Sequence, residues 1–578
     1  MTRPTTTGKA QDLITFTRST TGTYLDSVTY GDELVTNGTF DTDIDGWTSV
    51  NANLSASNGG MLIADNGSFS VAYQAVSTVI GKTYIIYVDA IDVPQLLTFN
   101  FGQGQAAPTG NDTYFDGTGE IINNLTVVGS FKHIFTAVAT TTYISFGTNS
   151  INAITIDNVS VKELTSGQGA QGTPLLRTAA IDEARIEYDA SGNCLGLLME
   201  EEKTNLLTYS EDFTSGWGAL NIVATPNIIA SPDGAVSGAK LQEDSSGTGG
   251  PRVYPADLAV LTANQAQTFS CFFKAGTSNY AYVTIRHSNQ NIAGVEFDLV
   301  NGTVNSTQDN GNMTVNGSDI TSVGNGWYRC SVTATCSVST SSGLYLLGLS
   351  DGTGILNGGY PNYALTGKNI YAWGAQVETS AFPTSYIPTS GSTVTRNKDV
   401  TSLPVERFAY NQSQGSIVCH FAYFFEQNSG NRRTYEFGDG TDSNVIRVLD
   451  HNNVNQLQAN VKSGGAGVAG ILINAPTMLS GVKTFQTYKL NGYIGGADGT
   501  LAGTDSNGLL PVGINKLSIG SNGAGVATMN GHITSLQYYP KKLTDAQLEL
   551  LTQPSASPTM NLTFNGQATS TLVEGFHD

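Results

Sequence analysis

The feature that most constrains this chain is a module pattern that occurs twice. Each copy opens with a segment that ends in phenylalanine, continues to a Gly-Trp pair and closes with an alternating apolar segment: residues 33–40, 46–47 and 154–163 in the first copy, and 205–213, 216–217 and 370–378 in the second. A pattern repeated at this distance indicates one module used twice. Modules strung along a chain are more typical of binding and display proteins than of enzymes with a single active site.

The length and the local patterns predict several β-domains. A chain of 578 residues is too long for one core, so three or four domains are expected. Short alternating runs such as residues 83–88, with turn residues between them and only 13% charged residues overall, predict an all-β architecture. One helix is predicted at residues 544–551, with Thr544 and Gln547 as a capping box and Leu548 and Leu551 on one buried face.

The charge of the chain excludes some partners. A formal net charge of −20 repels phosphate backbones and anionic membrane surfaces, so we expect no nucleic-acid partner. No apolar run is long enough to span a bilayer, and the N-terminus lacks the apolar core of a signal peptide, so we expect no membrane insertion. Most of the acidic surface is expected to serve solubility, with calcium in loops as a smaller role.

Cysteine and tryptophan are predicted to fill cores. The cysteines show no metal-ligand spacing, and the tryptophans all lie in scaffold motifs. These residues are Cys194, Cys271, Cys330, Cys336 and Cys419, and Trp47, Trp217, Trp327 and Trp373.

Composition divides the chain into six parts. They are an N-terminal arm and strand at residues 1–30, a first module at 31–164, a linker with a connecting β segment at 165–204, a second module at 205–395, a third β region at 400–552 and an extension at 553–578.

Four short segments carry a resemblance to virion proteins of tailed phages: residues 15–24, 184–188, 196–201 and 204–207. In that group the two halves of this segment usually lie close together, whereas here the first module stands between them. The resemblance therefore implies that residues 1–30 pair with residues 174–205 and that the first module is an insertion.

The three β regions also resemble known sandwiches. Residues 33–164 are similar to jelly-roll carbohydrate-binding modules through their opening at 37–40 and their close at 156–159. Residues 205–390 look like a relative of that sandwich in phage fibres, and residues 410–552 resemble a laminin-G/concanavalin-like sandwich. The fold implied is all-β: tandem antiparallel β-sandwiches, jelly-roll type twice and then concanavalin/laminin-G-like, with one short C-terminal helix.

A sugar platform needs an exposed aromatic ring, and the candidates are loop aromatics beside glycine and asparagine: Tyr114, Phe115, Tyr360 and Tyr363. The alternative for each is a loop aromatic packed on its own sheet. Related jelly-roll modules place calcium-facing residues near their first and last strands, which points to Asp41 and Asp157 as a structural calcium site. The alternative for these two is a carboxylate that caps a turn.

No catalytic residue is predicted. The sequence has no strand with alternating acidic residues of the glycosidase type, no Gly-x-Ser-x-Gly elbow, no phosphate loop and no close histidine pair. Because carboxylates can converge from distant strands, a depolymerase of surface polysaccharide stays open as an alternative.

The resemblances imply a structural protein exposed on a phage particle, assembled in the host cytoplasm, that binds a glycan of the host surface as a tail fibre or adhesin. Its other expected partners are virion subunits and further copies of itself, with a trimer expected by analogy with fibres. A decoration or assembly protein of the capsid or tail, without a glycan ligand, is the alternative from another class.

Overall fold

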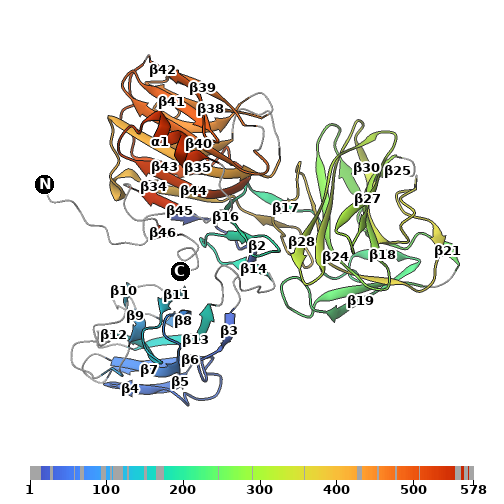
Figure 1. Ribbon diagram of the computed structural model, residues 1–578. Helices are drawn as coiled ribbons and strands as arrows, with labels where there is room; N and C mark the ends of the chain where they lie inside the picture. Colours follow the sequence, from blue (N-terminus) through green and yellow to red (C-terminus); the bar gives the residue numbers. More distant parts are fainter. Residues whose placement is uncertain are drawn as a thin grey trace. The chain divides into compact units, whose positions relative to one another are not determined.

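The structure is a computed structural model that describes residues 15–26, 30–57, 59–65, 70–92, 99–104, 107–108, 121–125, 129–148, 153–164, 175–244, 247–288, 291–356, 358–425, 432–451, 455–475, 478–506, 508–553, 561–564 and 570–571. The chain divides into two compact units (Figure 1), one built mainly from residues 1–27 and 173–576 and the other from residues 28–172. The predicted all-β architecture of tandem antiparallel sandwiches with one short C-terminal helix is confirmed.

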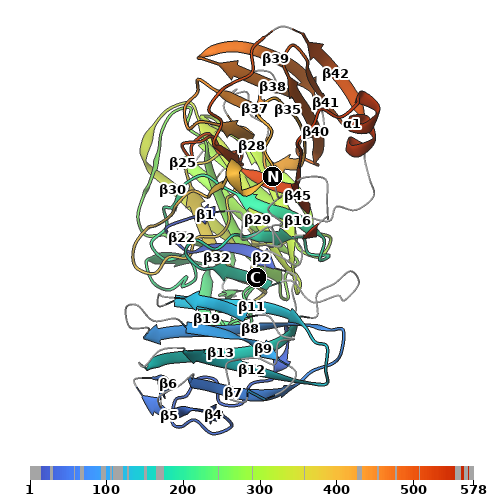
Figure 2. The ribbon, with the colours of Figure 1, turned by 90° about the vertical axis from the view of Figure 1, so that its left-hand side faces the viewer.

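Residues 28–172 form a jelly-roll-type sandwich of two antiparallel sheets (Figure 2). Its strands are β3 (Tyr30–Glu33), β4 (Thr48–Val50), β5 (Ala52–Ser57), β6 (Gly60–Asp65), β7 (Ser70–Ser77), β8 (Thr83–Asp92), β9 (Phe99–Gly104), β10 (Ile121–Leu125), β11 (Gly129–Thr136), β12 (Thr141–Thr148) and β13 (Ile154–Leu164). One sheet has the order β10-β9-β12-β7-β4; the other has the order β11-β8-β13-β6-β5, with β3 paired to β13. Met61, Ile86, Ile144 and Ile156 are fully buried between the layers, which accounts for the alternation in the sequence.

The second jelly-roll-type sandwich belongs to the larger unit. Its strands are β17 (Lys203–Asn205), β18 (Trp217–Leu220), β19 (Ile222–Ile229), β20 (Gly238–Glu243), β21 (Thr248–Gly249), β22 (Arg252–Pro255), β23 (Ala259–Leu261), β24 (Gln267–Ala275), β25 (Tyr280–Ser288), β26 (Asn291–Asp298), β27 (Thr303–Asp309), β28 (Met313–Gly324), β29 (Trp327–Cys336), β30 (Thr340–Ser350), β31 (Tyr363–Ala364), β32 (Asn369–Glu378) and β33 (Val394–Arg396). One sheet has the order β18-β22-β30-β25-β26-β27, with β23 paired to β30, and the other has the order β19-β20-β32-β24-β29-β28. The pairs β21–β31 and β17–β33 stand apart from both sheets.

The third sandwich is of the laminin-G/concanavalin-like type and takes strands from distant parts of the chain. Its strands are β1 (Thr15–Thr17), β15 (Ile186–Tyr188), β16 (Cys194–Met199), β34 (Val400–Pro404), β35 (Gln414–Tyr423), β36 (Arg433–Gly438), β37 (Val445–Asp450), β38 (Gln456–Ser463), β39 (Ala466–Asn474), β40 (Val482–Lys489), β41 (Tyr493–Ala497), β42 (Thr500–Asp505), β43 (Lys516–Ile519), β44 (Gly531–Tyr539), β45 (Asn561–Phe564) and β46 (Ser570–Thr571). One sheet has the order β1-β34-β43-β36-β37-β38-β39 and the other β15-β16-β44-β35-β40-β41-β42, while β45 runs parallel to β44 and pairs with β46. Because β1, β15 and β16 complete these sheets, residues 400–552 do not make the sandwich alone.

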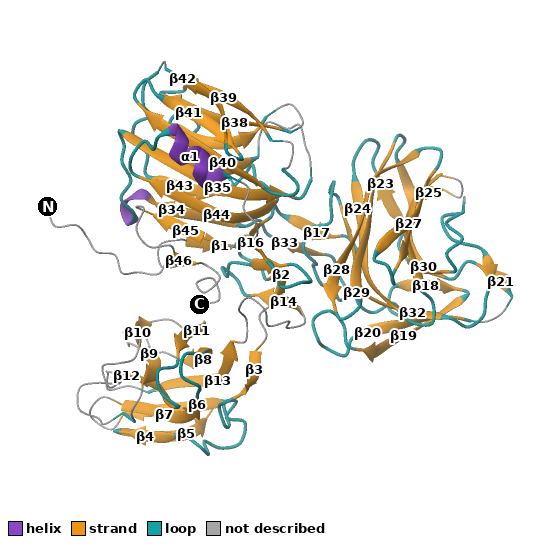
Figure 3. Ribbon diagram, viewed as in Figure 1, coloured by secondary structure: helices purple, strands orange, loops and turns teal. Residues whose placement is uncertain are grey.

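The predicted helix is present as α1 (Asp545–Thr552) and lies over the sheet that contains β35 and β40 (Figure 3). Its capping box is confirmed: Thr544 accepts the backbone N–H of Gln547, and the side chain of Gln547 accepts the N–H of Thr544. Leu548 is fully buried, but the prediction for Leu551 is wrong, because 38% of that residue is exposed. Thr552, one turn after Leu548, completes the buried row instead. A single turn of 3₁₀ helix, η2 (Val405–Arg407), follows β34.

Two further strands form a hairpin in the larger unit. β2 (Gly22–Asp26) pairs antiparallel with β14 (Leu175–Ala179), and Asp26 lies opposite Leu175. The chain therefore leaves this ladder at Asp26 and returns to it at Leu175, so residues 28–172 occupy the position of a hairpin loop.

Beside this hairpin lies a buried ion cluster of three arginines and two carboxylates. Asp399 accepts from Arg18 at 3.1 Å through one oxygen and from Arg185 at 2.5 Å through the other. Glu200 pairs with Arg185 at 2.8 Å and with Arg396 at 3.4 Å. All five side chains are at most 1% exposed, so each charge depends on the others for its solvation.

Further hydrogen bonds fix the ion cluster to the surrounding backbone. Arg185 donates to the carbonyl of Thr23, and Ser385 donates to Glu200 through both its N–H and its hydroxyl at 2.7 Å. Three of the charged residues, Arg18, Arg185 and Glu200, lie within segments 15–24, 184–188 and 196–201, which carry the resemblance to phage proteins. The ion cluster gives these separated segments a common physical role, since they meet around one set of charges.

The repeated opening gives the same local structure in both jelly-roll sandwiches. The indole N–H of Trp47 donates to the carbonyl of Asn37 at 3.1 Å, and that of Trp217 donates to the carbonyl of Tyr209 at 2.9 Å. In each copy the phenylalanine of the opening packs on the tryptophan, with ring centroids 5.5 and 5.0 Å apart.

The repeated close also has a common structure. The N–H of Val159 donates to the carbonyl of Gly38, and that of Ala375 donates to the carbonyl of Ser210, so each closing strand is tied to its opening segment. The residue before each donor has a positive φ: Asn158 (50°) and Gly374 (60°). Such a residue bends the strand toward the opening segment.

The core predictions for tryptophan and cysteine are confirmed by burial. Trp47, Trp327 and Trp373 are at most 8% exposed, and Trp217 is partly buried against the core of the second sandwich. All five cysteines are buried. In the described part of the chain, no helix combines the length and the apolar character needed to cross a membrane.

Candidate functional site

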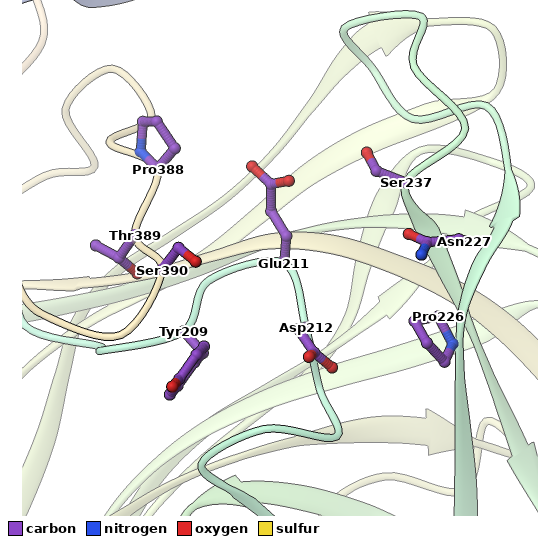
Figure 4. Close-up of a pocket in the computed structure, with 9 residues that line it drawn as sticks. All are labelled: Tyr209, Glu211, Asp212, Pro226, Asn227, Ser237, Pro388, Thr389 and Ser390. Atoms are coloured by element: carbon purple, nitrogen blue, oxygen red, sulfur yellow. The ribbon is translucent and has the colours of Figure 1, made fainter.

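The second sandwich has a polar pocket of about 370 Å³ beside its opening segment (Figure 4). Four separate pieces of chain line it: the opening segment, the bulged part of β19, the residue before β20 and the segment after β32. The lining residues are Tyr209, Glu211, Asp212, Pro226, Asn227, Ser237, Pro388, Thr389 and Ser390.

Tyr209 supplies the aromatic surface of the pocket. Its backbone carbonyl holds Trp217, which fixes the main chain, while its phenol hydroxyl has no hydrogen-bond partner among the described residues. The ring lies against Gly216, whose φ is +69°; a Cβ there would stand 2.8 Å from Cδ2 of the ring. The glycine of the repeated Gly-Trp pair therefore makes room for the tyrosine.

Glu211 points into the pocket, between Pro388 and Ser237 (Figure 4). One carboxylate oxygen accepts the hydroxyl of Tyr386 at 2.9 Å, and the indole N–H of Trp373 also hydrogen-bonds to this carboxylate. Burial raises the pKa of this carboxyl, although the hydrogen bond from Tyr386 partly opposes that effect. Because a carboxylate has about four acceptor positions, Glu211 keeps acceptor capacity for a ligand beside these two bonds.

Asp212 is the next residue, but its carboxylate serves its own turn. One oxygen accepts the N–H and the hydroxyl of Thr214 at 2.8 and 2.5 Å, and the other accepts the hydroxyl of Ser215 at 2.7 Å. These bonds outweigh burial and lower the pKa of Asp212. Figure 4 shows the Asp212 side chain directed away from that of Glu211.

Two further side chains add hydrogen-bonding capacity. Asn227, with a φ of 57°, lies where the ladder between β19 and β20 is irregular, and its amide faces the pocket (Figure 4). The hydroxyl of Thr389 is buried and has no hydrogen-bond partner within the described ranges. A buried hydroxyl without a partner is costly, and a ligand group or a water could satisfy it.

Single residues of this pocket gave no signal in the sequence, because ordinary polar residues from positions 209–237 and 388–390 meet only through the fold. The nearest signal was the repeated opening at 205–213, which we interpreted as scaffold.

The predicted glycan candidates fall into three cases. Tyr114 and Phe115 lie outside the described residues. Tyr363 is 8% exposed, and its hydroxyl donates to Glu243 at 2.7 Å, so its ring does not offer a free face for a sugar. Tyr360 is half-buried, and the guanidinium of Arg252 lies 3.9 Å from its ring centroid.

The predicted calcium residues lie near one another in the unit of residues 28–172. Burial raises the pKa of Asp157, and the charges of Asp89 and Asp41 raise it further. One oxygen of Asp157 is buried without a hydrogen-bond partner in the described structure. However, Asp41 accepts the hydroxyl of Thr39 and Asp89 accepts the amide of Asn158, both at 2.8 Å. Among the described residues no group of three His, Cys, Asp or Glu side chains could hold a metal ion, so the geometry does not support a calcium cage.

We expect Asp157→Asn to raise the thermal unfolding temperature at neutral pH in a chelator. The folded carboxylate is destabilised by burial and by like charge, and a raised pKa in the folded state makes the wild type less stable as pH rises through the carboxyl range. Calorimetry over pH should show the advantage of the variant shrinking in acid, where the wild-type carboxyl is protonated. If added calcium stabilised the wild type and not the variant, Asp157 would instead be a calcium ligand.

Comparisons with known proteins give structural similarities only. No protein-family model matches the chain, and no curated protein matches it. A solved structure described as "CBM4 structure and function" is 22% identical over 22% of this chain and 99% of its own, with a TM-score of 0.18.

Two other solved structures cover more of the chain at lower identity. The tandem CBM22-1–CBM22-2 domains of Paenibacillus barcinonensis Xyn10C are 10% identical over 61% of this chain and 100% of their own, with a TM-score of 0.18. Domains LG4–5 of the mouse laminin α1 chain are 10% identical over 48% of this chain and 83% of their own, with a TM-score of 0.16. At these identities and TM-scores the matches assign no ligand and no activity to this chain.

Proposed function

We propose that the protein binds a surface glycan in the pocket of its second sandwich, as an adhesion protein exposed on a tailed-phage particle. The observation that carries the proposal is the combination, around one cavity, of the Tyr209 ring, the remaining acceptor capacity of the Glu211 carboxylate and the buried Thr389 hydroxyl, which has no partner among the described residues. A sugar ring presents an apolar C–H face and several hydroxyls, each of which donates and accepts. A half-buried aromatic ring beside acceptors and hydroxyls is complementary to both.

The phage assignment is supported by the sequence segments that resemble virion proteins. The ion cluster supports the view that these segments form one structural element. Other virion subunits and a host glycan are the partners of this proposal. Each sugar contact is weak, so useful affinity comes from several copies of the chain, a trimer by analogy with fibres, acting together.

The test is a glycan array probed with the full chain and three variants. We expect Tyr209→Ala and Glu211→Gln to weaken binding to the recognised glycan about tenfold or more, since each removes a central contact. Glu406→Gln is the control, because Glu406 is exposed on the third sandwich, far along the chain from the pocket. The thermal unfolding temperature of the Tyr209 variant should change little, because its side chain makes no hydrogen bond in the described structure. Binding unchanged by both pocket variants would contradict the proposal.

One observation favours a second function, a polysaccharide depolymerase. Glu211 and Asp212 line the same pocket, and their pKa values are shifted in opposite directions, as in pairs that act as acid and nucleophile. Two points favour binding: both oxygens of Asp212 are occupied by its own turn, and its side chain is directed away from Glu211. Release of reducing sugar from host polysaccharide by the wild type, abolished in Glu211→Gln, would establish the enzyme instead.

A further inference from the structure

A second cluster of polar and aromatic groups lies on the other sheet of the same sandwich. Along β25 and β22, alternate residues form the core, and the residues between them face outward. Arg286 of β25 lies opposite Leu344 of β30. On the other side of β30, Val253 of β22 lies opposite Leu347, and Arg252 is the residue before Val253. Two arginines therefore stand on the outer face of this sheet, on the strands either side of β30.

The loop before β31 brings the two guanidinium groups together. Arg286 donates to the carbonyl of Gly358 at 3.3 Å, and Arg252 lies over the ring of Tyr360 at 3.9 Å from its centroid. The loop can lie this close to the sheet because Gly359 has no side chain: a Cβ there would stand 2.9 Å from Thr284. The apolar base of the cluster, Tyr282, Ile292, Leu346 and Ile355, is buried, so the arginines are set on a fixed support.

Neither arginine has an acidic partner in the described structure, although the chain carries 47 acidic and 27 basic residues. Within the described ranges, Arg252 donates only to the carbonyl of Gly250, and Arg286 only to that of Gly358. Burial and the charge of Arg252 lower the pKa of Arg286. The hydroxyls of Tyr254 and Tyr360 also have no hydrogen-bond partner within the described ranges. An uncompensated pair of partly buried cations beside free hydroxyls favours a bound anion.

We infer that Arg252, Arg286, Tyr254 and Tyr360 form a site for the carboxylate of an acidic sugar. A guanidinium presents parallel N–H donors that match the two oxygens of a carboxylate, and the tyrosine hydroxyls can bond the sugar hydroxyls beside it. Arg252 already covers one face of Tyr360, so this ring positions the arginine rather than serving as a bare platform. This site lies on the sheet that contains β22, β30 and β25, whereas the pocket of Tyr209 lies beside the other sheet. The inference therefore does not depend on the function proposed for that pocket.

The experiment is calorimetric titration of short oligogalacturonate into the full chain, with the neutral oligogalactose of the same length and inorganic sulfate as parallel titrants. We expect oligogalacturonate to bind and the neutral oligomer to bind at least about tenfold more weakly, as loss of one charged hydrogen-bonding group implies. Sulfate should bind only weakly, because it lacks the sugar ring. Affinity should fall as salt is added, because the contact is ionic.

Variants separate this site from general charge effects. Arg252→Gln and Arg286→Gln should each reduce oligogalacturonate affinity about tenfold or more. Lys368→Gln, which removes the same charge from an exposed position on the same sandwich, should leave the affinity unchanged. The arginine variants should keep their unfolding temperature, since each relieves a repulsion between like charges, and Glu211→Gln should retain acidic-sugar binding. Absence of binding by the wild type, or equal binding by the arginine variants, would overturn the inference; sulfate binding as tight as that of the sugar would show a simple anion site instead and overturn it too.

Discussion

Replacing Asp399 with Asn is expected to lower the free energy of unfolding of the larger unit by about 3–5 kcal/mol. Each oxygen of Asp399 pairs with a different buried arginine, Arg18 or Arg185, and one of them also accepts the N–H of Glu200. Asn keeps the size of the side chain but removes its charge, so three buried arginines remain against one carboxylate. Denaturant titration followed by near-UV circular dichroism measures the change.

Asp257→Asn is the matched control for this variant, because Asp257 is exposed and has no hydrogen bond or ion pair among the described residues. We expect its stability to match that of the wild type. If Asp399→Asn were equally neutral, the ion cluster would not stabilise the fold.

The same cluster predicts how acid destabilises the protein. Burial alone would raise the pKa of Glu200, but the charges of Arg396 and Arg185 and the hydrogen bonds from Ser385 outweigh burial and lower the pKa from 4.5 to about 2. The folded state therefore holds fewer protons than the unfolded state between these values. The contribution of Glu200 is complete above about pH 4.5 and is lost as pH falls toward 2. Glu200→Gln should flatten the stability profile in this window.

The second prediction with a large expected effect concerns which segments of the chain the larger unit needs in order to fold. A chain in which residues 27–174 are replaced by Asn-Gly is expected to fold, because Asp26 and Leu175 are already paired and this dipeptide closes a two-residue hairpin. Residues 400–578 alone are expected not to fold. Without β1, β15 and β16, the strands β34 and β44 each lose one neighbouring strand, and the core loses Ile186, Leu197 and Met199.

Size-exclusion chromatography and calorimetry compare the two deletions. The first should keep the unfolding transition of the larger unit, and the second should show no cooperative transition. The first deletion serves as the internal control, because it keeps residues 1–26 and 175–399 together with residues 400–578. A cooperative transition of residues 400–578 alone would contradict the expectation.

The elements that the sequence predicts well depend on neighbours along the chain. The capping box of α1 needs only Thr544 and Gln547, three residues apart, and the repeated opening encodes a local hydrogen bond from a Trp indole to a carbonyl 10 or 8 residues before it. The resemblance to sandwiches agrees with strands whose alternation is visible in short windows.

The parts that escaped prediction depend on distant pairings. Arg18 and Asp399 are 381 positions apart, and neither residue differs from an ordinary surface charge when read alone. The pocket is missed for the same reason, since the segments of Glu211 and Thr389 are far apart in the sequence and meet only through backbone hydrogen bonds such as that from Ser210 to Thr389. The prediction for Leu551 fails even though it is local. Its spacing from Leu548 allows burial, but the helix turns Thr552 rather than Leu551 toward the sheet beneath it.

The pairing of Asp26 with Leu175 has a consequence for how such a protein can evolve. To the rest of the chain, the inserted sandwich is a closed loop, and each doubling of loop length costs only about 0.6 kcal/mol in closure entropy. A larger, smaller or unrelated domain can therefore be inserted between Asp26 and Leu175 without changes in the rest of the larger unit. New binding specificities can be acquired at this position by exchange of whole inserted domains, while the ion cluster of the larger unit stays unchanged.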